Sequence, residues 1–392
     1  MPSGTADESR WAKGRRAMKT FDEINETMLY RCLMRIRPWT APGIDGITRN
    51  EFRLSDGLSI LARQLQNGTF VPSPCRRVWL PKPGADPRPL AVPTIRDRVA
   101  QAAMAGLLSC RYEPEFFDGS FGFRPGRRAN QAVRGAMRAI ELRRTPIVVE
   151  FDIEGFFDSV RHEDVLTRLV EDRIDPRIVG LVTAFLRTPI DDGGVVSVPT
   201  IGTPQGGPLS PILANLILDR ALDAWFPARA SVEGWADPVL IRYADDFVII
   251  VGDIATAKQV LALVAERLGE FRLTLSAKKT RWVSLRPVVE GERADFDFLG
   301  WTIRYEEHEH GRRLVRRTSQ KSIRRTLQRL KREMRDPAWR KKTPSERHDW
   351  FLAVVRGHRE YFGIAENEEL VRHFTNRFER LFRLAEHRTS TR

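Results

Sequence analysis

Two adjacent aspartates inside an apolar stretch constrain the fold of this chain most. Asp245 and Asp246 separate two strand-length apolar runs, residues 239–243 and 247–251, which are rich in β-branched and aromatic side chains. This pattern predicts a β-hairpin with both carboxylates at its tip, where the backbone turn lets neighbouring side chains share one site. An exposed turn is the more common setting for Asp-Asp. Here, however, the apolar strands hold the acids near a buried sheet, where they repel each other unless a cation such as Mg²⁺ compensates them.

A third acid is expected on another strand. Residues 145–152 form an apolar run that ends in Asp152, and a glycine-containing turn and Phe156-Phe157 follow. Asp152, then Thr-Pro-Gln-Gly-Gly-Pro-Leu-Ser-Pro at 203–211, then Tyr-Ala-Asp-Asp at 243–246 resembles, in order and spacing, the palm of a bacterial group II intron-type reverse transcriptase.

The resemblance covers roughly residues 38–390 and implies a fold of the α/β (α+β) class. It implies a right-hand polymerase with fingers, a palm built of an antiparallel sheet and helices, and a helical thumb. In a departure from the family pattern, we expect no appended DNA-binding or His/Asn-rich endonuclease region. We expect four ranges: an N-terminal helical extension at 1–37, fingers with part of the palm at 38–144, the palm with the catalytic site at 145–301, and a basic thumb with part of the maturase domain X at 302–392.

Charge points independently to a polyanionic partner. The 392-residue chain has a formal net charge of +14, and residues 312–342 carry 14 Lys and Arg against two acidic residues. No stretch is apolar enough to cross a membrane, and the N-terminus lacks the apolar core of a signal peptide, so we expect no membrane partner and a cytoplasmic protein. Three cysteines without metal-ligand spacing predict neither disulfides nor a zinc site.

The resemblance implies two-metal nucleotidyl transfer with two Mg²⁺ ions, for which Mn²⁺ can substitute. The metal ligands would be the catalytic acids Asp152, Asp245 and Asp246, together with the backbone carbonyl of Ile153. Nucleotide binding is expected of basic residues at a fingers hairpin, of a bulky ring that excludes a ribose 2′-hydroxyl, of a pocket glutamine and of a lysine beyond the acids. These residues are Lys82, Arg88, Phe157, Gln205 and Lys279.

Template and primer contacts are expected from several other motifs. The sequence Ser-Phe-Gly-Phe-Arg-Pro-Gly-Arg-Arg at 120–128 resembles a loop beneath the template and nucleotide, and Phe-Asp-Phe-Leu-Gly-Trp at 296–301 resembles the primer grip. Taken alone, glycine-rich turns and surface arginines are more often structural or solvated. The expected contacts are Arg124, Pro125, Gly206, Tyr243, Phe298, Leu299, Gly300, Arg316, Arg317, Arg324 and Arg325.

Periodicity and capping signals predict the secondary structure. We expect helices at 21–37, 161–186, 212–222 and 255–272, a helix that ends at Gly68 and another capped by Thr94. Two hairpins are expected, a pair of short strands within 76–90 and a second hairpin at 191–198, as well as a strand at 273–281. Beyond residue 302 the chain is expected to be helical.

The resulting function is RNA-directed DNA polymerase, with an RNA template, a DNA or RNA primer and dNTPs as partners, and with group II intron RNA or another structured RNA as a further candidate. One alternative is a non-catalytic maturase that binds RNA and assists splicing. Others are a group II-like enzyme adapted to phage defence or DNA repair, and RNA-templated RNA synthesis, which Phe157 disfavours. The resemblance leads us to expect several tens of residues after Arg388, whereas the given sequence stops at Arg392. A maturase must hold folded RNA through a wide surface. With that surface shortened, we expect splicing to be weak or absent and polymerase activity to be robust.

Overall fold

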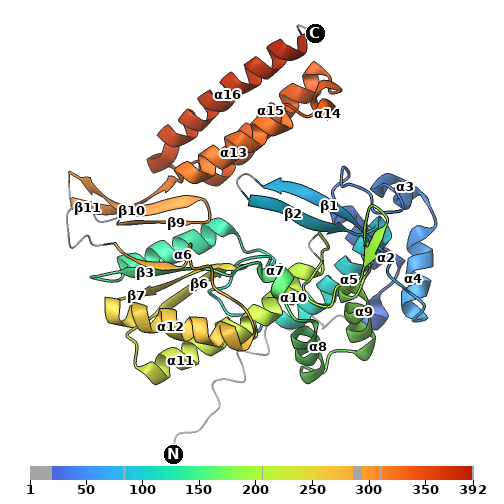
Figure 1. The fold of residues 1–392 in the computed structure, drawn as a ribbon, viewed down its shortest axis with the longest axis horizontal. Helices are drawn as coiled ribbons and strands as arrows, with labels where there is room; N and C mark the ends of the chain where they lie inside the picture. The colour runs from blue at the N-terminus through green and yellow to red at the C-terminus, as the bar shows by residue number, and fades with distance from the viewer. Residues whose placement is uncertain (1–19, 83–84, 205, 286–293, 310, 391–392) are drawn as a thin grey trace, which may run out of the picture. The chain divides into compact units, whose positions relative to one another are not determined.

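The computed structural model describes residues 20–82, 85–204, 206–285, 294–309 and 311–390, which form a mixed α/β fold of two compact units (Figure 1). Of the described residues, those within 20–127, 153–229 and 264–275 form unit 1, and those within 128–152, 230–263 and 276–390 form unit 2. Helices α11 (Trp225–Glu233) and α12 (Ile254–Glu270) each run from one unit into the other. The units therefore interleave along the chain, and the four contiguous ranges expected from the sequence stay a prediction.

Unit 1 is built around a small sheet with strand order β2-β1-β4-β5, in which β1 runs parallel to β4 and the other pairs are antiparallel. Buried Cys75, Ala91 and Ile190 join its strands. Its elements are η1 (Phe21–Glu23), α2 (Glu26–Arg35), α3 (Arg49–Leu54), α4 (Gly57–Gln66), β1 (Cys75–Lys82), β2 (Ala85–Val92), α5 (Ile95–Tyr112), α7 (Phe156–Ser159), α8 (His162–Glu171), α9 (Pro176–Leu186), β4 (Ile190–Asp192), β5 (Val195–Ser197), α10 (Ser210–Leu218) and η2 (Asp219–Asp223).

Unit 2 contains a four-stranded antiparallel sheet, β6-β7-β3-β8, and a three-stranded sheet, β11-β10-β9. Phe151 and Phe247 stack with ring centroids 4.7 Å apart in the centre of the first sheet. Its elements are α6 (Ala129–Glu141), β3 (Ile147–Asp152), β6 (Val239–Tyr243), β7 (Asp246–Val251), β8 (Arg281–Ser284), β9 (Asp295–Phe298), β10 (Trp301–His308), β11 (Gly311–Thr318), α13 (Gln320–Glu333), α14 (Pro337–Arg340), α15 (Pro344–Phe362), η3 (Ala365–Asn367) and α16 (Glu368–Ser390).

The helices at the C-terminal end of unit 2 share a core of their own. Apolar side chains at helical spacing on α13 face those of α15 and α16, so the three helices form a bundle (Figure 1). This core is lined by Ile323, Leu327, Leu330, Met334, Trp339, Phe374, Phe378 and Phe382. No helix in the described ranges is both long and apolar enough to cross a membrane.

Several local signals are confirmed. The Thr94 hydroxyl accepts a hydrogen bond from the backbone N–H of Asp97 (3.1 Å) and so caps α5. Gly68 follows α4 with a φ of +68°, as expected for the left-handed residue that ends a helix. Strands β6 and β7 form the expected hairpin, and β3 ends in Asp152.

Three predictions of secondary structure were wrong. The helix expected at 21–37 is shorter, because Asn25 accepts a hydrogen bond from the N–H of Met28 (3.0 Å) and starts α2 there. The strand expected at 273–281 is a turn, in which the Ser276 carbonyl accepts from the N–H groups of Lys279 and Thr280, and β8 begins only at Arg281. Residues 302–308 belong to β10 and residues 311–318 to β11, since the two strands pair antiparallel along their whole length and bury Ile303, Leu314 and Val315, which outweighs the helical expectation from charge.

Candidate active site

The three aspartates expected from the sequence lie together in unit 2. Asp152, the last residue of β3, is the direct antiparallel partner of Asp246, the first residue of β7. Asp245 occupies the two-residue turn between β6 and β7, and Ala244 takes up the sharp backbone reversal with a φ of +57°. The pairing of two strand ends thus places a carboxylate on β3 beside the Asp-Asp turn, while the apolar strands behind them are buried.

Lys279 provides a positive charge at this acidic cluster. Its ammonium group donates to both carboxylate oxygens of Asp152, at 2.9 and 2.8 Å. The turn at residues 276–280 produces this contact, because the N–H of Ser276 donates to the Asp152 carbonyl (2.8 Å) and fixes the turn beside β3. Lys279, which was expected to bind nucleotide, therefore forms an ion pair with Asp152, which was expected to bind metal.

The carboxylates of the cluster repel one another. Burial, and then the neighbouring carboxylates of Asp245, Asp152 and Glu150, raise the pKa of Asp246 to about 7, while Lys279 lowers it. In the described ranges, no group of three or more His, Cys, Asp and Glu side chains is arranged to hold a metal ion. The donor set nevertheless fits hard cations, which prefer carboxylate and carbonyl oxygen, and the ammonium group already marks one cation position on Asp152.

Two further residues, Glu150 and Arg281, lie on the face of the sheet that carries Asp152 and were not expected from the sequence. Glu150 lies two residues before Asp152 on β3 and therefore shares its face of the sheet. Arg281 is the direct partner of Glu150 on β8, and its Nε–H donates to the Glu150 carboxylate. Period-two spacing from Asp152 could have identified Glu150. Arg281 was missed because β8 was expected to end, not begin, at this residue.

These groups open onto a cavity of about 770 Å³ within unit 2. Its acidic lining residues come from β3, β7 and β9, whereas the basic residues come from β8, the turn before it and α13. The lining includes Glu150, Asp152, Asp246, Lys278, Lys279, Arg281, Asp297, Leu299, Gly300, Lys321, Arg325 and Tyr361. A cavity lined by both carboxylates and cationic side chains suits the binding of a polyanion close to a metal-dependent site.

The residues expected at the primer grip form the tight turn between β9 and β10. Leu299 and Gly300 have φ values of +51° and +86°, and both line the cavity. The Tyr361 hydroxyl on α15 donates to the Leu299 carbonyl (2.8 Å) and holds the turn. Phe298 is only 1% exposed, so its side chain packs in the core. Tyr243, half-buried, pairs with Asp246 at the end of β6.

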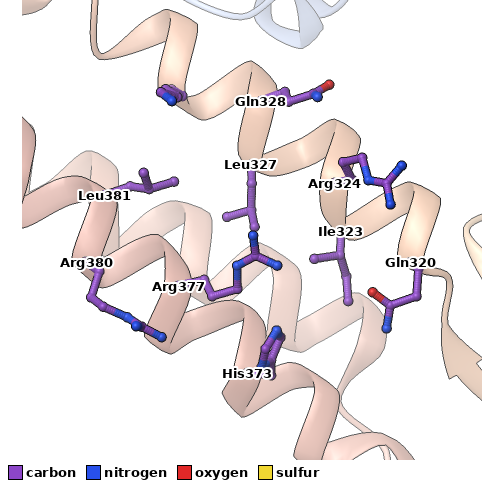
Figure 2. A pocket seen from close by; sticks show the side chains of 10 residues that line it. Gln320, Ile323, Arg324, Leu327, Gln328, His373, Arg377, Arg380 and Leu381 are labelled. Carbon is purple, nitrogen blue, oxygen red and sulfur yellow. The ribbon is translucent and has the colours of Figure 1, made fainter.

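The four arginines expected to contact template or primer beyond residue 302 occupy different settings. Arg317 on β11 is ion-paired with Glu306 (2.6 Å), and the half-buried Arg316 lies over the Trp301 ring at 5.0 Å. Arg324 and Arg325 are neighbours on α13 but line different hollows: Arg325 lines the cavity, and Arg324 lines a groove between α13 and α16. Figure 2 shows that groove, which is lined by Gln320, Ile323, Arg324, Leu327, Gln328, Lys331, His373, Arg377, Arg380 and Leu381.

In unit 1, Phe157 is held in place by the segment that carries the Gln-Gly-Gly sequence. The Phe157 carbonyl accepts from the N–H of Thr203 (2.7 Å), and its ring meets the Phe123 ring edge-on at 6.3 Å. A Cβ on Gly206 would lie 2.7 Å from the Ala91 carbonyl oxygen, so this glycine allows the loop to approach β2. Its place is thus explained by packing within unit 1. Gln205 lies outside the described residues.

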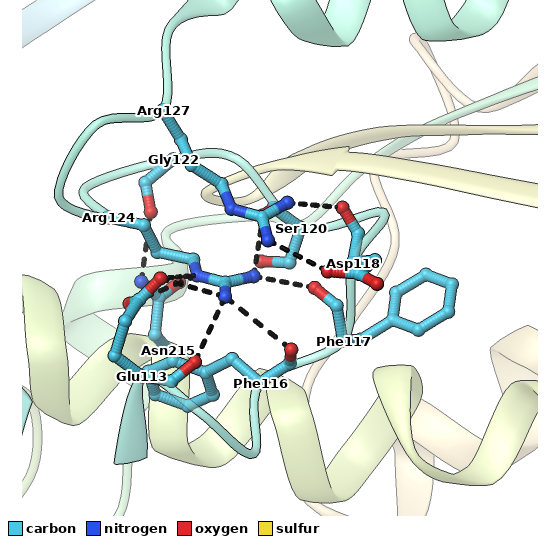
Figure 3. Close-up of polar contacts among 9 residues, drawn as sticks. All are labelled: Glu113, Phe116, Phe117, Asp118, Ser120, Gly122, Arg124, Arg127 and Asn215. Carbon is cyan, nitrogen blue, oxygen red and sulfur yellow. Dashed lines mark hydrogen bonds and ion pairs between the residues drawn. The ribbon is translucent and has the colours of Figure 1, made fainter. Parts of the chain in front are cut away.

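Arg124 lies inside its loop and not at the surface (Figure 3). Its guanidinium donates to the Glu113 carboxylate (3.0 Å) and to the carbonyls of Phe117 (2.6 Å) and Ser120 (2.8 Å). Asn215 on α10 donates to the Gly122 carbonyl (2.9 Å) and anchors the same loop. These contacts suit a residue that shapes the loop, and direct contact with nucleic acid would require the guanidinium to leave them.

The remaining expected residues of unit 1 are accessible where the structure describes them. Arg88 is exposed on β2, opposite Leu80. Lys82 is the last residue of β1, and its side chain lies outside the described part. Pro125 is exposed beside the buried Arg124.

Comparison with known proteins supports one family. Residues 80–303 match the family described as reverse transcriptase (RNA-dependent DNA polymerase). Protein YkfC of Escherichia coli is 33% identical over 279 residues, which cover 61% of this chain and 71% of YkfC. The group II intron-encoded protein LtrA of Lactococcus lactis is 35% identical over 159 residues, which cover 40% of this chain and 26% of LtrA.

A more distant relative is a 91 kDa protein in the cob intron of Schizosaccharomyces pombe, which is 26% identical over 283 residues. These residues cover 58% of this chain and 35% of that protein. The chain therefore spans most of YkfC but only about a quarter of LtrA. The matched family segment includes all three aspartates and the cavity turn at 299–300.

Proposed function

The chain belongs to the reverse transcriptase (RNA-dependent DNA polymerase) family, and we propose that it extends the 3′ end of a DNA or RNA primer on an RNA template, using dNTPs. The observation that carries this proposal is the direct pairing of Asp152 with Asp246 beside Asp245, at the wall of a cavity with basic side chains. We assign the palm to β3 and β6–β8, the thumb to the bundle of α13, α15 and α16, and the fingers to β1 and β2.

We assign the metal sites to the carboxylates of Asp152, Asp245 and Asp246 and to the Ile153 carbonyl. These residues would hold two Mg²⁺ ions, of which one would lower the pKa of the primer 3′-hydroxyl and the other would neutralise charge on the leaving pyrophosphate. The three carboxylates are held in place because each lies at the end of a buried strand or in the turn next to it. Little reorganisation of these side chains is therefore needed at the moment of reaction.

Lys279 exchanges partners in this proposal. In the protein alone its ammonium group neutralises Asp152. When nucleotide binds, the ammonium moves to a phosphate oxygen, and Asp152 becomes available as a ligand. Arg88, Lys82 and Gln205 would complete the nucleotide site, and the Phe157 ring would exclude a ribose 2′-hydroxyl.

Template and primer would follow the basic surfaces of unit 2. Leu299 and Gly300 offer backbone at the cavity wall, and Arg325 and Lys321 extend the basic lining along α13. In unit 1, the exposed Pro125 is the candidate for direct contact, whereas Arg124 and Gly206 would act by shaping the loops that carry such contacts.

The decisive test is primer extension on RNA by wild type and Asp245→Asn, with and without Mg²⁺ or Mn²⁺. Wild type should extend only with the metal, and the variant should lose extension while keeping its affinity for template–primer, because Asp245 is assigned to metal and not to nucleic acid. Arg304→Met, which removes a surface ion pair of the same unit, is the control and should extend normally. Undiminished synthesis by Asp245→Asn would overturn the site.

A second candidate function is that of an RNA-binding maturase. The groove between α13 and α16 favours it, because Arg324, Lys331, Arg377 and Arg380 line a hollow outside the catalytic cavity (Figure 2). The partner would be group II intron RNA or another structured RNA, and a role in phage defence or DNA repair would use the same polymerase. Splicing of an adjacent intron at near-physiological Mg²⁺ tests this: protein-dependent splicing by Asp245→Asn would support a maturase.

A further inference from the structure

The ion pair between Glu150 and Arg281 has an unusual position for a structural contact. Both side chains line the catalytic cavity, and both stand on the face of the sheet that carries Asp152. The Glu150 side chain is 12% exposed and that of Arg281 is 37% exposed. The carboxylate is thus largely enclosed, whereas part of the guanidinium faces the open cavity.

Glu150 is fixed by more than one strand. Its carboxylate accepts from Arg281 on β8 and from the backbone N–H of Asp297 on β9, the strand that leads to the turn at Leu299 and Gly300. Asp297 is held in turn by the Thr302 hydroxyl (2.6 Å). The carboxylate therefore has a defined position between the catalytic sheet and the cavity turn, and it fixes the guanidinium through Nε.

This arrangement leaves the outer edge of the guanidinium available. Arginine offers five N–H donors, of which only the Nε–H is engaged in a contact described for Arg281. A guanidinium that is already oriented loses less side-chain entropy on binding than a free lysine or arginine, and its outer edge matches two phosphate oxygens. Lys321 and Arg325, by contrast, are exposed on α13.

We propose that Arg281, oriented by Glu150, binds a backbone phosphate of the primer strand within its last three nucleotides. The inference rests on the proposed polymerase function, because the primer 3′-hydroxyl must reach Asp152 and Asp246. Glu150 lies two strand residues from Asp152, roughly 6.6–6.8 Å along the strand, so Arg281 stands beside the catalytic acids at about the reach of one nucleotide. Arg281 is then a binding residue and Glu150 a positioning residue.

The test is metal-free binding of a labelled primer annealed to an RNA template, measured by fluorescence anisotropy over a range of salt concentrations. Arg281→Met should weaken binding roughly tenfold, as expected for a hydrogen bond to a charged group. The log–log salt slope should become shallower by about 0.7–0.9, the value for one lost phosphate contact. Arg304→Met is the matched control, and it should keep both the affinity and the slope of wild type.

The contacted phosphate is located with primers that carry one uncharged methylphosphonate at each of the last three linkages in turn. At one linkage, the methylphosphonate should weaken primer binding by wild type but should not weaken binding by Arg281→Met any further. At the other two linkages, wild type should still bind the modified primer about tenfold more tightly than Arg281→Met does. Glu150→Gln should cause a smaller loss, and Glu150→Gln combined with Arg281→Met should be no weaker than Arg281→Met. A loss of the same size at all three linkages would overturn the proposal.

An Arg281→Met variant with wild-type affinity and slope would also overturn it. If that variant fails to fold, Arg281→Lys is the substitute, because it keeps the positive charge but loses the paired N–H donors of the guanidinium. It should show an intermediate loss of primer affinity at the same linkage. The assay needs no metal and no turnover. Failure of wild type to extend the same primer with Mg²⁺ would therefore refute the polymerase function separately, without deciding the phosphate contact.

Discussion

At the scale of single residues, Phe157 tests substrate choice. Phe157→Ala should admit ribonucleotides, because the change removes the ring proposed to exclude the 2′-hydroxyl but keeps the carbonyl that accepts from Thr203. We expect the ratio of kcat/KM for dNTP over rNTP to fall about 10–100-fold. Phe123→Ala, which removes the neighbouring ring, is the control. An equal fall in both variants would mean that ring packing, not a gate at Phe157, sets selectivity.

Substitution of Lys279 tests whether its ammonium group competes with metal for Asp152. Lys279→Met should bind Mn²⁺ more tightly than wild type in the absence of nucleotide, because the ammonium group competes with metal for Asp152. A half-exposed pair contributes about 1 kcal/mol, so the gain should be roughly fivefold. Primer extension should nevertheless fall, with a raised KM for dNTP.

The measurements are Mn²⁺ titration followed by electron paramagnetic resonance, and steady-state kinetics. Lys278→Met is matched to this variant, since Lys278 also lines the cavity but is not described in contact with an acid. It should leave both quantities near wild type. Weaker Mn²⁺ binding by Lys279→Met would contradict the proposed exchange.

At the scale of elements, α15 and α16 should respond to pH through His358. This side chain is 9% exposed and stacks on Phe374 with centroids 3.6 Å apart, and burial lowers its pKa to about 4. Because the folded state binds the proton less readily than the unfolded state, the stabilisation is fully present above pH 6.5. It is lost as the pH falls from about 6.5 towards 4, by at most about 3 kcal/mol.

His358→Phe should remove this pH dependence while keeping the stacking. The measurement is hydrogen exchange of the α15 and α16 amides between pH 7 and 4, with rates corrected for intrinsic exchange. His373→Phe, which removes an exposed histidine on α16, should retain the wild-type dependence. If His358→Phe loses protection in the same pH window as wild type, another group is responsible.

The sequence predicted elements where one local signal decided the structure. Thr94 as a cap, Gly68 after a helix, and the hairpin around Asp245 were all local in this sense. Prediction from the sequence failed where distant contacts decide the local structure. The turn at 276–280 depends on the Asp152 carbonyl, and the arginine-rich β11 depends on pairing with β10.

The candidate site shows the same limit. Asp152 and the Asp-Asp turn were found because their order and spacing lie in the sequence. The pairing of Glu150 with Arg281 requires the register of β3 against β8, which no local pattern specifies. Arg324 and Arg325 could not be separated either, because their different surroundings depend on how α13 packs against α16.

At the scale of the whole molecule, chain topology decides which parts can fold alone. The range 38–144, expected to hold the fingers, depends on distant segments: β1 pairs with β4, and Asn215 binds the loop at Gly122. The range 318–388 instead contains every residue of the core shared by α13, α15 and α16. It also retains the buried Asn367, which accepts from the Thr318 N–H (2.8 Å) and donates to the Phe362 carbonyl (2.9 Å).

We therefore expect a fragment of residues 318–388 to fold as a helical bundle and a fragment of 38–144 to remain unfolded. A core of this size supplies about 3–5 kcal/mol, so the thermal transition, followed by circular dichroism at moderate salt, should be cooperative but low. Phe378→Ala should abolish it, because Phe378 is fully buried against Phe351 and Phe374 and its loss costs about 3–5 kcal/mol. Cooperative unfolding of the 38–144 fragment, or a bundle that tolerates Phe378→Ala, would show that the chain has different folding units.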